Sequence, residues 1–316
     1  MRVPRNLLAA IRKENFFMIA AHIDPDGDAI GSALALSAAL ETMGKKTFVY
    51  SRDPVPTYYR FLPGHEKITA RVREVTKRDP ILVLVDCNSP ARAAVDKFSF
   101  RRSIVIDHHE TENDFGDVRW VDSEAAAAGM MIFRLIKALR INFTREMATN
   151  LYTAISVDTG TFRYSNTSAD VLRASAELVD AGAEPNFIAN SLYETWDYKR
   201  FRLLILALNT FELKEKIAMI HVTKDMFRKT GTSSEDTEHF SNFPRMIGTI
   251  RMAVLLRELE DGAWKVSLRS KGSINVARIA ALFGGGGHKN AAGFKMKADL
   301  KTVKETLYRA GRRTRA

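Results

Sequence analysis

Three apolar runs constrain the fold of the first part of the chain more than any other feature. FFMIAA (Phe16 to Ala21), ILVLVD (Ile81 to Asp86) and SIVID (Ser103 to Asp107) are apolar almost without interruption. A strand with one wet face alternates apolar and polar residues, whereas these runs predict strands that are covered on both faces. A helical pattern, SALALSAALETMG, follows the first run. We therefore expect an α/β domain with a mostly parallel sheet sandwiched between helices.

The pattern changes after a long helix expected at Tyr198 to Leu213. IAMIHVT reads as a strand, and MAVLLRELEDGAWKVSLRS reads as two strands joined at Asp261-Gly262. A helix is expected in NVARIAALF and a basic closing helix in LKTVKETLYRAGRR. These elements predict a smaller C-terminal α+β domain. At 316 residues the chain exceeds the usual domain size, and we expect a first domain at 1–190, a helical linker at 191–213 and a second domain at 214–316.

Composition excludes several classes of protein. No apolar stretch approaches the roughly 20 residues of a membrane-spanning helix, and the segment MRVPRNLLAAIRKEN lacks the apolar stretch of a signal peptide. The one cysteine, Cys87, cannot form an internal disulfide, which suits a reducing compartment. We expect a cytoplasmic protein.

The net charge of +11 is unevenly distributed. Residues 1–210 hold 27 Lys and Arg against 26 Asp and Glu, whereas residues 211–316 hold 21 against 11. A basic second half beside acidic motifs in the first suggests a polyanionic ligand. A solvated basic surface explains the charge alone equally well.

Polar residues follow the predicted strands. His22 comes directly after FFMIAA, Asp86 ends ILVLVD, and Asp107 ends SIVID with His108 and His109 just beyond. In an open α/β sheet the carboxyl ends of the strands form the ligand crevice, so we expect these side chains to converge there. Asp158, at the end of a predicted helix, begins the polar turn DTGTFRYSNT, which could reach the same crevice.

The segment HIDPDGDAIGS, from His22 to Ser32, collects three carboxylates and a histidine within seven residues. Crowded carboxylates repel one another and are costly to desolvate, and divalent cations offset that cost. Oxygen and imidazole ligands suit manganese, magnesium, zinc or iron, and the lack of thiolates argues against structural zinc. Two such cations can activate water for in-line phosphoryl displacement. His22 alone would suggest a core histidine, but four clusters together favour a metal site.

The motifs HIDPDGDAIGS, VDC, IDHHE and VDTGTFRY resemble, in this order, those of the DHH phosphoesterase superfamily, named for Asp107-His108-His109. SLRSKGSINV and FGGGGHKNAAGF resemble the C-terminal substrate domain of its NrnA-like subfamily. The resemblance implies two divalent cations, manganese before others. Their implied ligands are His22, Asp26 and Asp86 for one cation, and Asp28, Asp86, His108 and Asp158 for the other. Asp24 falls outside the pattern H-x-x-x-D-x-D.

The resemblance also implies roles for the remaining residues. His109 would face the scissile phosphate and Asp107 would orient the histidines. Cys87 should point to the other face of its strand. Substrate contacts are expected from the second domain, at Arg269, Lys271, Gly284, Gly285, Gly286, Gly287 and His288, with help from Lys289. We expect the glycine amides to face an anion; the alternative is that the four glycines form only a flexible link.

The function implied by the resemblance is hydrolysis of short oligonucleotides, including linear dinucleotides such as pApA and pGpG, to mononucleotides. The same site is expected to remove the 3′-phosphate of 3′-phosphoadenosine 5′-phosphate. Alternatives are a cyclic-dinucleotide phosphodiesterase, an inorganic pyrophosphatase, which the basic glycine-rich half disfavours, and a RecJ-like exonuclease, for which we expect a longer chain with additional nucleic-acid-binding domains. A non-catalytic nucleotide-binding regulator should have lost metal ligands, and none is missing. The oligomeric state stays open, with a homodimer among the alternatives.

Overall fold

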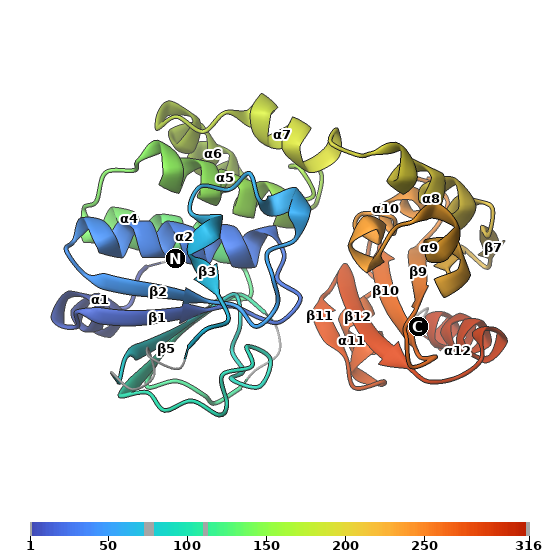
Figure 1. The fold of residues 1–316 in the computed structure, drawn as a ribbon, viewed down its shortest axis with the longest axis horizontal. Helices are drawn as coiled ribbons and strands as arrows, with labels where there is room; N and C mark the ends of the chain where they lie inside the picture. Colours follow the sequence, from blue (N-terminus) through green and yellow to red (C-terminus); the bar gives the residue numbers. More distant parts are fainter. Residues whose placement is uncertain (1, 73–78, 110–112, 314–316) are drawn as a thin grey trace. The chain divides into compact units, whose positions relative to one another are not determined.

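The chain forms two compact units, Met1–Thr195 and Trp196–Ala316, in the computed structural model, which describes residues 2–72, 79–109 and 113–313 (Figure 1). Within the described residues no helix is long and apolar enough to cross a membrane. The expected domain limits at 190, 191–213 and 214 remain a prediction.

The first unit is built on a six-stranded sheet in which all neighbouring strands are parallel. The strand order is β3-β2-β1-β4-β5-β6. From β1 the chain adds β2 and β3 toward one edge of the sheet, and it then returns to the centre and adds β4, β5 and β6 toward the other edge. The topological switch point therefore lies between β1 and β4. The strands are β1 (Phe16–Ala20), β2 (Lys46–Tyr50), β3 (Ile68–Thr69), β4 (Ile81–Val85), β5 (Arg102–Asp107) and β6 (Val118–Val121).

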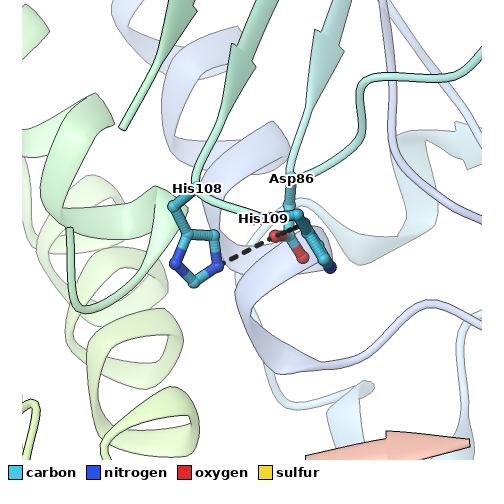
Figure 2. A group of neighbouring side chains, drawn as sticks. All are labelled: Asp86, His108 and His109. Carbon is cyan, nitrogen blue, oxygen red and sulfur yellow. Dashed lines mark ion pairs between the residues drawn. The ribbon is translucent and has the colours of Figure 1, made fainter. Parts of the chain in front are cut away.

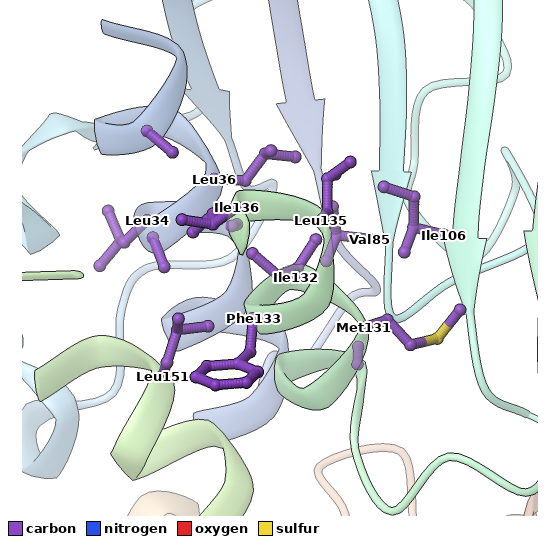
Figure 3. Close-up of a cluster of buried hydrophobic side chains, with 14 of the residues drawn as sticks. Leu34, Leu36, Val85, Ile106, Met131, Ile132, Phe133, Leu135, Ile136 and Leu151 are labelled. Carbon is purple, nitrogen blue, oxygen red and sulfur yellow. The ribbon is translucent and has the colours of Figure 1, made fainter. Parts of the chain in front are cut away.

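The core of this unit lies between one face of the sheet and a group of helices. Figure 3 shows Ile132 and Leu135 of α4 packed toward Val85 and Ile106 of the central strands, and Leu34 and Leu36 of α2 belong to the same cluster. The predicted α/β fold with a parallel sheet is confirmed. The helices are α1 (Arg5–Lys13), α2 (Gly27–Thr42), α4 (Ala128–Leu139), α5 (Arg145–Asp158), α6 (Ala169–Asp180) and α7 (Pro185–Tyr193), with short 3-10 turns at Thr57–Tyr59 and His65–Lys67.

The opposite face of the sheet is also buried. Leu82 and Leu84 of β4 pack there with Val95, Phe98 and other apolar side chains of the segment that follows β4. β4 is consequently buried along its whole length, as its uninterrupted apolar sequence predicts.

The second unit contains a mixed six-stranded sheet in the order β11-β12-β10-β9-β8-β7. β8 and β9 are parallel and the other neighbours are antiparallel. The strands are β7 (Glu212–Lys214), β8 (Ile217–Val222), β9 (Met252–Glu258), β10 (Trp264–Ser270), β11 (Gly286–His288) and β12 (Ala291–Met296). The helices are α8 (Tyr198–Leu208), α9 (Lys224–Thr230), α10 (Asn242–Arg245), α11 (Val276–Ala281) and α12 (Leu300–Arg313), with a 3-10 turn at Ser234–Thr237.

Two predicted helix ends differ from the structure. The helix expected at Tyr198 to Leu213 ends at Leu208, and Glu212–Lys214 forms the edge strand β7 instead. Thr210 explains the break, because its hydroxyl accepts the amide of His221 in β8 and ties the chain to the sheet. The sequence of residues 185–196 also has a helical pattern, but α7 ends at Tyr193.

Candidate metal centre

The candidate site lies at the carboxyl ends of β1 and β4, the two strands at the switch point of the first sheet. His22 follows β1 and Asp86 follows β4. Asp86 has a φ of 56°, in the left-handed region that Asp and Asn enter more readily than most residues. The backbone therefore turns sharply where this carboxylate leaves the strand.

His22, Asp26 and Asp86 form a first group whose ligand atoms all lie within 4.8 Å of one another. His22 Nε2 is 3.4 Å from Asp86 Oδ2 and 4.0 Å from Asp26 Oδ1. His22 Nδ1 lies 2.8 Å from the carbonyl oxygen of Ile23, which can only accept, so Nδ1 carries a proton. The ring therefore presents Nε2 to the two carboxylates.

Asp26 also starts helix α2. Its Oδ1 accepts the amides of Asp28 and Ala29 at 3.1 and 3.0 Å, which makes it the N-cap of the helix. The neighbouring Asp24 is exposed and belongs to none of the candidate metal groups among the described residues.

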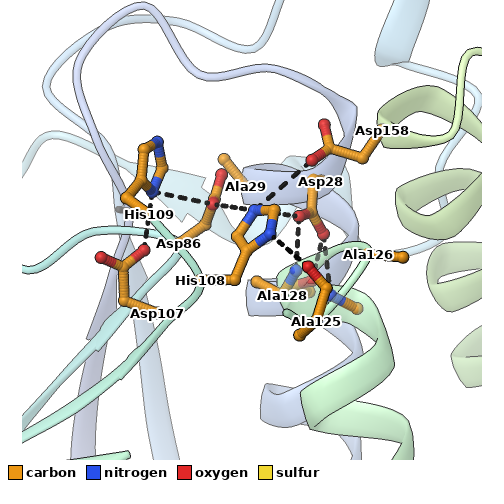
Figure 4. Close-up of polar contacts among 12 residues, drawn as sticks. Asp28, Ala29, Asp86, Asp107, His108, His109, Ala125, Ala126, Ala128 and Asp158 are labelled. Atoms are coloured by element: carbon orange, nitrogen blue, oxygen red, sulfur yellow. Dashed lines mark hydrogen bonds and ion pairs between the residues drawn. The ribbon is translucent and has the colours of Figure 1, made fainter. Parts of the chain in front are cut away.

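Asp28, His108 and Asp158 form a second group within the same 4.8 Å limit. His108 Nε2 lies 3.4 Å from Asp28 Oδ2 and 3.4 Å from Asp158 Oδ2 (Figure 4). Asp158 is the last residue of α5, so the polar turn after that helix does reach the strand ends.

The Asp28 carboxylate is fixed by three donors from its own helix and from α4. It accepts the amide of Ala128 at 2.6 Å, the amide of Gly129 at 2.8 Å and the hydroxyl of Ser32 at 2.9 Å. These amides are at the start of α4, whose partial positive charge favours an anion. Asp28 is therefore fully buried and held in one orientation.

His108 is oriented by the main chain. Its Nδ1 lies 3.0 Å from the carbonyl oxygen of Ala125 and must donate to it, so Nε2 faces the carboxylates. Nε2 is 3.2 Å from Asp86 Oδ1 as well as close to Asp28 and Asp158. A proton on the ring or on a carboxyl group, or a cation, is needed there, because a lone pair on Nε2 would otherwise face the oxygens of three carboxylates.

Asp86 is shared between the groups. It belongs to the first group, and it also forms a third group with His108 and His109 (Figure 2). Its buried Oδ1 lies 3.2 Å from His108 Nε2 and 3.6 Å from His109 Nδ1, yet accepts no hydrogen bond from the described residues. A buried anionic oxygen without a donor is what a cation would satisfy.

The electrostatics show how strongly these groups interact. Burial raises the pKa of Asp28 to about 7, and the charge of Asp86 acts in the same direction. Burial, followed by the charge of Asp28, raises the pKa of Asp158 well above its usual range. Burial would lower the pKa of His22, but its contact with Asp86 raises it to about 9. His108 behaves alike: burial opposes its charge, and Asp86 and Asp158 raise its pKa well above the usual value. The site thus retains protons that a cation would displace.

His109 and Asp107 make a separate buried pair. His109 Nδ1 donates to Asp107 Oδ1 at 2.7 Å, and both side chains are buried (Figure 4). The Asp107 carboxylate thereby fixes the ring of His109. The expectation that Asp107 orients both histidines differs from the structure at His108, which is held by Ala125 instead.

Cys87 lies on the other side of the sheet. Its side chain is fully buried in the apolar cluster of that face, and burial raises the thiol pKa to about 11. It is part of no candidate metal group in the described ranges.

The residues predicted for substrate contacts lie in the second unit. Arg269 is on β10, and its Nη1 donates to the carbonyl oxygen of Leu268 at 3.1 Å. Lys271 directly follows β10, and its Nζ donates to the carbonyl oxygen of Ile247 at 2.9 Å. His288 ends the edge strand β11.

The four glycines form a defined structure. The amides of Gly284 and Gly285 donate to the carbonyl oxygens of Ala281 and Ala280 at the end of helix α11. These two amides are therefore not directed at an anion, which differs from the expectation. Gly286 and Gly287 pair with β12. A Cβ on Gly285 would lie 2.2 Å from the carbonyl oxygen of Gly293, and Gly287 has a φ of 138°. Glycine is therefore required by close strand approach and by backbone conformation.

Sequence reasoning did not find the groups that orient the ligands. Ser32, the amides of Ala128 and Gly129, and the carbonyl oxygen of Ala125 all contact Asp28 or His108. Only the position of Ser32, one helical turn after Asp28, could have indicated its contact. The segment from Ala125 to Gly129 is about a hundred residues from Asp28 and carries no polar side chain.

The residues present fit divalent cations. They combine carboxylate oxygens with imidazole nitrogens, the ligand types preferred by several such cations. Oδ1 of Asp86 lacks a hydrogen-bond donor among the described residues. The main chain of Ala128 and Ala125 orients the ligands Asp28 and His108.

Comparison with known proteins agrees with this arrangement. The model of the DHH family, N-terminal domain, matches residues 17–155, and that of the DHHA1 domain matches residues 218–310. The chain is 36% identical to the bifunctional oligoribonuclease and PAP phosphatase NrnA of Thermus thermophilus, over 98% of this chain and 95% of the relative. It is 28% identical to the Bacillus subtilis protein of the same name, over 94% and 97% of the two chains.

A solved structure is similar over the same extent. An exopolyphosphatase-related protein from Bacteroides fragilis has a TM-score of 0.88 and 28% sequence identity, covering 96% of this chain and 94% of that one. With full-length similarity to NrnA, both domain models matched and all the DHH motif residues in place, the chain belongs to the DHH family of phosphoesterases, in the group with a DHHA1 domain.

Proposed function

We propose that the protein is a metal-dependent phosphodiesterase that degrades short oligonucleotides to mononucleotides and removes the 3′-phosphate of 3′-phosphoadenosine 5′-phosphate. The observation that carries the proposal is a pair of adjacent ligand groups: Asp86 belongs to the first, and its Oδ1 lies 3.2 Å from His108 Nε2 of the second. The printed names of the NrnA relatives, an oligoribonuclease and PAP phosphatase, support the substrates.

Two divalent cations, most favourably Mn²⁺, would be held by these groups. His22, Asp26 and Asp86 would ligate one, and Asp28, Asp86, His108 and Asp158 the other. When bound, the cations would supply Lewis-acid stabilisation of the phosphate and a water of lowered pKa. The two proposed ligand sets have only Asp86 in common, and each contains further ligands of its own. Two cations with Asp86 between them fit these sets better than one cation does.

His109, held by Asp107, would act as the proton donor of the reaction. With Nδ1 donating to Asp107, the other ring nitrogen, Nε2, can carry a second proton and donate it to a phosphate oxygen or to the departing oxygen. Asp107 would stabilise the resulting imidazolium, as a buried carboxylate does for a catalytic histidine.

Substrate recognition would come from the second unit. Arg269, Lys271, His288 and the backbone of Gly286 and Gly287 would hold the terminal nucleotide of the substrate; the amides of Gly284 and Gly285 are used within the end of α11. We assign residues 1–190 to the catalytic domain, 191–213 to the linker and 214–316 to the substrate domain. We also infer a cytoplasmic location, which suits a chain whose single cysteine is buried and inert.

The test is a substrate panel with purified, chelated protein to which Mn²⁺ is returned. The panel contains pApA, RNA of two to about thirty residues, 3′-phosphoadenosine 5′-phosphate, cyclic di-AMP and pyrophosphate. We expect mononucleotides from pApA and a rate that falls as the RNA lengthens. Preferred hydrolysis of pyrophosphate or of cyclic di-AMP would contradict the proposal, and so would binding of pApA without any hydrolysis, which identifies a regulator.

A further inference from the structure

Helix α8 is apolar on two sides, and the second unit covers only one of them. On the covered side, Leu203, Leu204 and Ala207 are buried in a cluster with apolar side chains of β8 and β9 (Figure 1). The other side carries four large apolar residues that are exposed: Tyr198, Phe201, Ile205 and Leu208. A helix that is apolar all round is normally buried all round. These four residues, the α8 stripe, therefore indicate a surface for a partner.

The exposed apolar surface continues beyond the end of α8. The amide of Phe211 donates to the carbonyl oxygen of Leu208, so the chain continues the turn, and both Phe211 and Leu213 are exposed. With the α8 stripe they make up more than half of the exposed large apolar residues in the described part of the chain.

The area of this surface is large enough for an interface between two copies. The six residues are between 38% and 76% exposed. At about 200 Å² for a large apolar residue, these fractions leave about 600 Å² exposed, at the top of the range for the largest apolar patch of a monomer. Two copies that cover this surface bury about 1,200 Å², above the roughly 1,000 Å² expected of a biological interface.

The α8 stripe is symmetric along the helix. Phe201 and Ile205 are equally distant from position 203, and so are Tyr198 and Leu208. The stripe therefore keeps its pattern when the direction of the helix is reversed. An interface of two identical chains about a two-fold axis needs such a self-complementary surface. In an antiparallel pair of α8 helices, Phe201 of one copy faces Ile205 of the other, and Tyr198 faces Leu208, so each contact joins an aromatic and an aliphatic side chain.

The charges of α8 favour the antiparallel orientation. Lys199 and Arg202 lie near the start of the helix, and its first turn holds no acidic residue. The positive end of the helix dipole disfavours cations there. In an antiparallel pair, the cationic first turn of each helix lies beside the last turn of the other, where the partial negative charge favours a cation. A parallel pair would instead bring the same cations together.

We propose that the protein forms a homodimer in which the α8 stripes of two copies pack antiparallel about a two-fold axis. All the residues involved belong to the second unit, and the inference does not depend on the proposed function. Because the interface is at the small end of specific interfaces, we expect a dissociation constant in the micromolar range.

Sedimentation velocity of wild type from about 1 to 100 μM tests the association. Wild type should change from monomer to dimer within this range. Phe201→Glu and Ile205→Glu should each raise the dissociation constant at least about tenfold, because they place a carboxylate without a partner at the centre of the interface. Leu172→Glu on α6 is the matched control, since Leu172 is 52% exposed and Phe201 is 53% exposed. It should leave the dissociation constant unchanged.

Cross-linking tests the orientation. Tyr198→Cys and Leu208→Cys chains are mixed and oxidised, with oxidised wild type as the control for the buried Cys87. The two substituted positions face each other in the antiparallel pair, whereas the two copies of position 198 are about 15 Å apart along the helix axis. The mixture should therefore give a covalent dimer, and the Tyr198→Cys protein alone should give none.

Wild type that stays monomeric over the whole concentration range would overturn the proposal. If it also sediments with vesicles of phosphatidylglycerol, the stripe is a lipid-binding surface instead. A dimer that both glutamate variants leave unchanged, or a covalent dimer from Tyr198→Cys alone, contradicts the antiparallel α8 interface as well. Circular dichroism checks the fold of each variant, and the cross-linking result decides if a glutamate variant does not fold.

Discussion

The affinity of the site for Mn²⁺ should fall steeply between pH 8 and pH 6. Asp28, with a pKa of about 7, must lose its proton to ligate a cation, and so must His22, with a pKa of about 9. Both pKa values are above those of the unfolded chain. The protonated forms therefore stabilise the cation-free protein at low pH, and this stabilisation is lost as the pH rises through about 7 for Asp28 and about 9 for His22.

The size of the effect follows from the ionised fractions. From pH 8 to pH 6 the deprotonated fraction of Asp28 falls about tenfold, and that of His22 about a hundredfold. Affinity should thus fall about a hundredfold for the cation held by His22, Asp26 and Asp86. For the cation beside Asp28 it should fall at least tenfold, because the pKa of Asp158 is raised as well.

Calorimetry at pH 6, 7 and 8, in buffers of different ionisation enthalpy, measures both the affinity and the protons released. The Mn²⁺ affinity of a site with exposed carboxylates and an ordinary histidine would fall only about fourfold from pH 8 to pH 6. A change of that size, or binding without proton release, would refute the reasoning.

Three substitutions test other parts of the structure. Gly129→Ala should lower the free energy of unfolding by about 1–3 kcal/mol, measured by urea denaturation, because its Cβ would lie 2.8 Å from that of Ala154; unchanged stability would show that the helices separate easily. Asp24→Asn should keep most activity on pApA while Asp26→Asn abolishes it, and equal losses would show that the ligand assignment is shifted. Asp107→Asn should lower kcat about 10²–10⁴-fold with cation content unchanged, whereas loss of the cations would make Asp107 part of the metal site.

The sheet of the first unit could be predicted because its central strands, β1, β4 and β5, are buried almost along their whole length. β4, buried throughout, leaves no other interpretation of ILVLVD. The convergence of His22, Asp86 and His108 followed from the position of each at a strand end. These inferences depend on local sequence and on a general rule of sheet topology.

The parts that could not be predicted depend on contacts between distant segments. The carbonyl oxygen of Ala125 orients His108, and the amide of Ala128 holds Asp28, but a main-chain group has no sequence signature. The early end of α8 likewise depends on the bond between Thr210 and β8.

The claim that the protein is a metal-dependent phosphodiesterase is tested most directly with the Asp86→Asn variant. Its Mn²⁺ content and its pApA turnover are measured beside those of wild type. Asn nearly preserves the shape of the side chain but removes a charge that belongs to the first ligand group and lies 3.2 Å from His108 of the second. We expect bound Mn²⁺ to fall and turnover to drop more than about a hundredfold, beyond the loss typical of an outer-sphere change, with an unchanged circular dichroism spectrum. Near-normal turnover in Asp86→Asn, or wild-type turnover that survives complete chelation, would contradict the account.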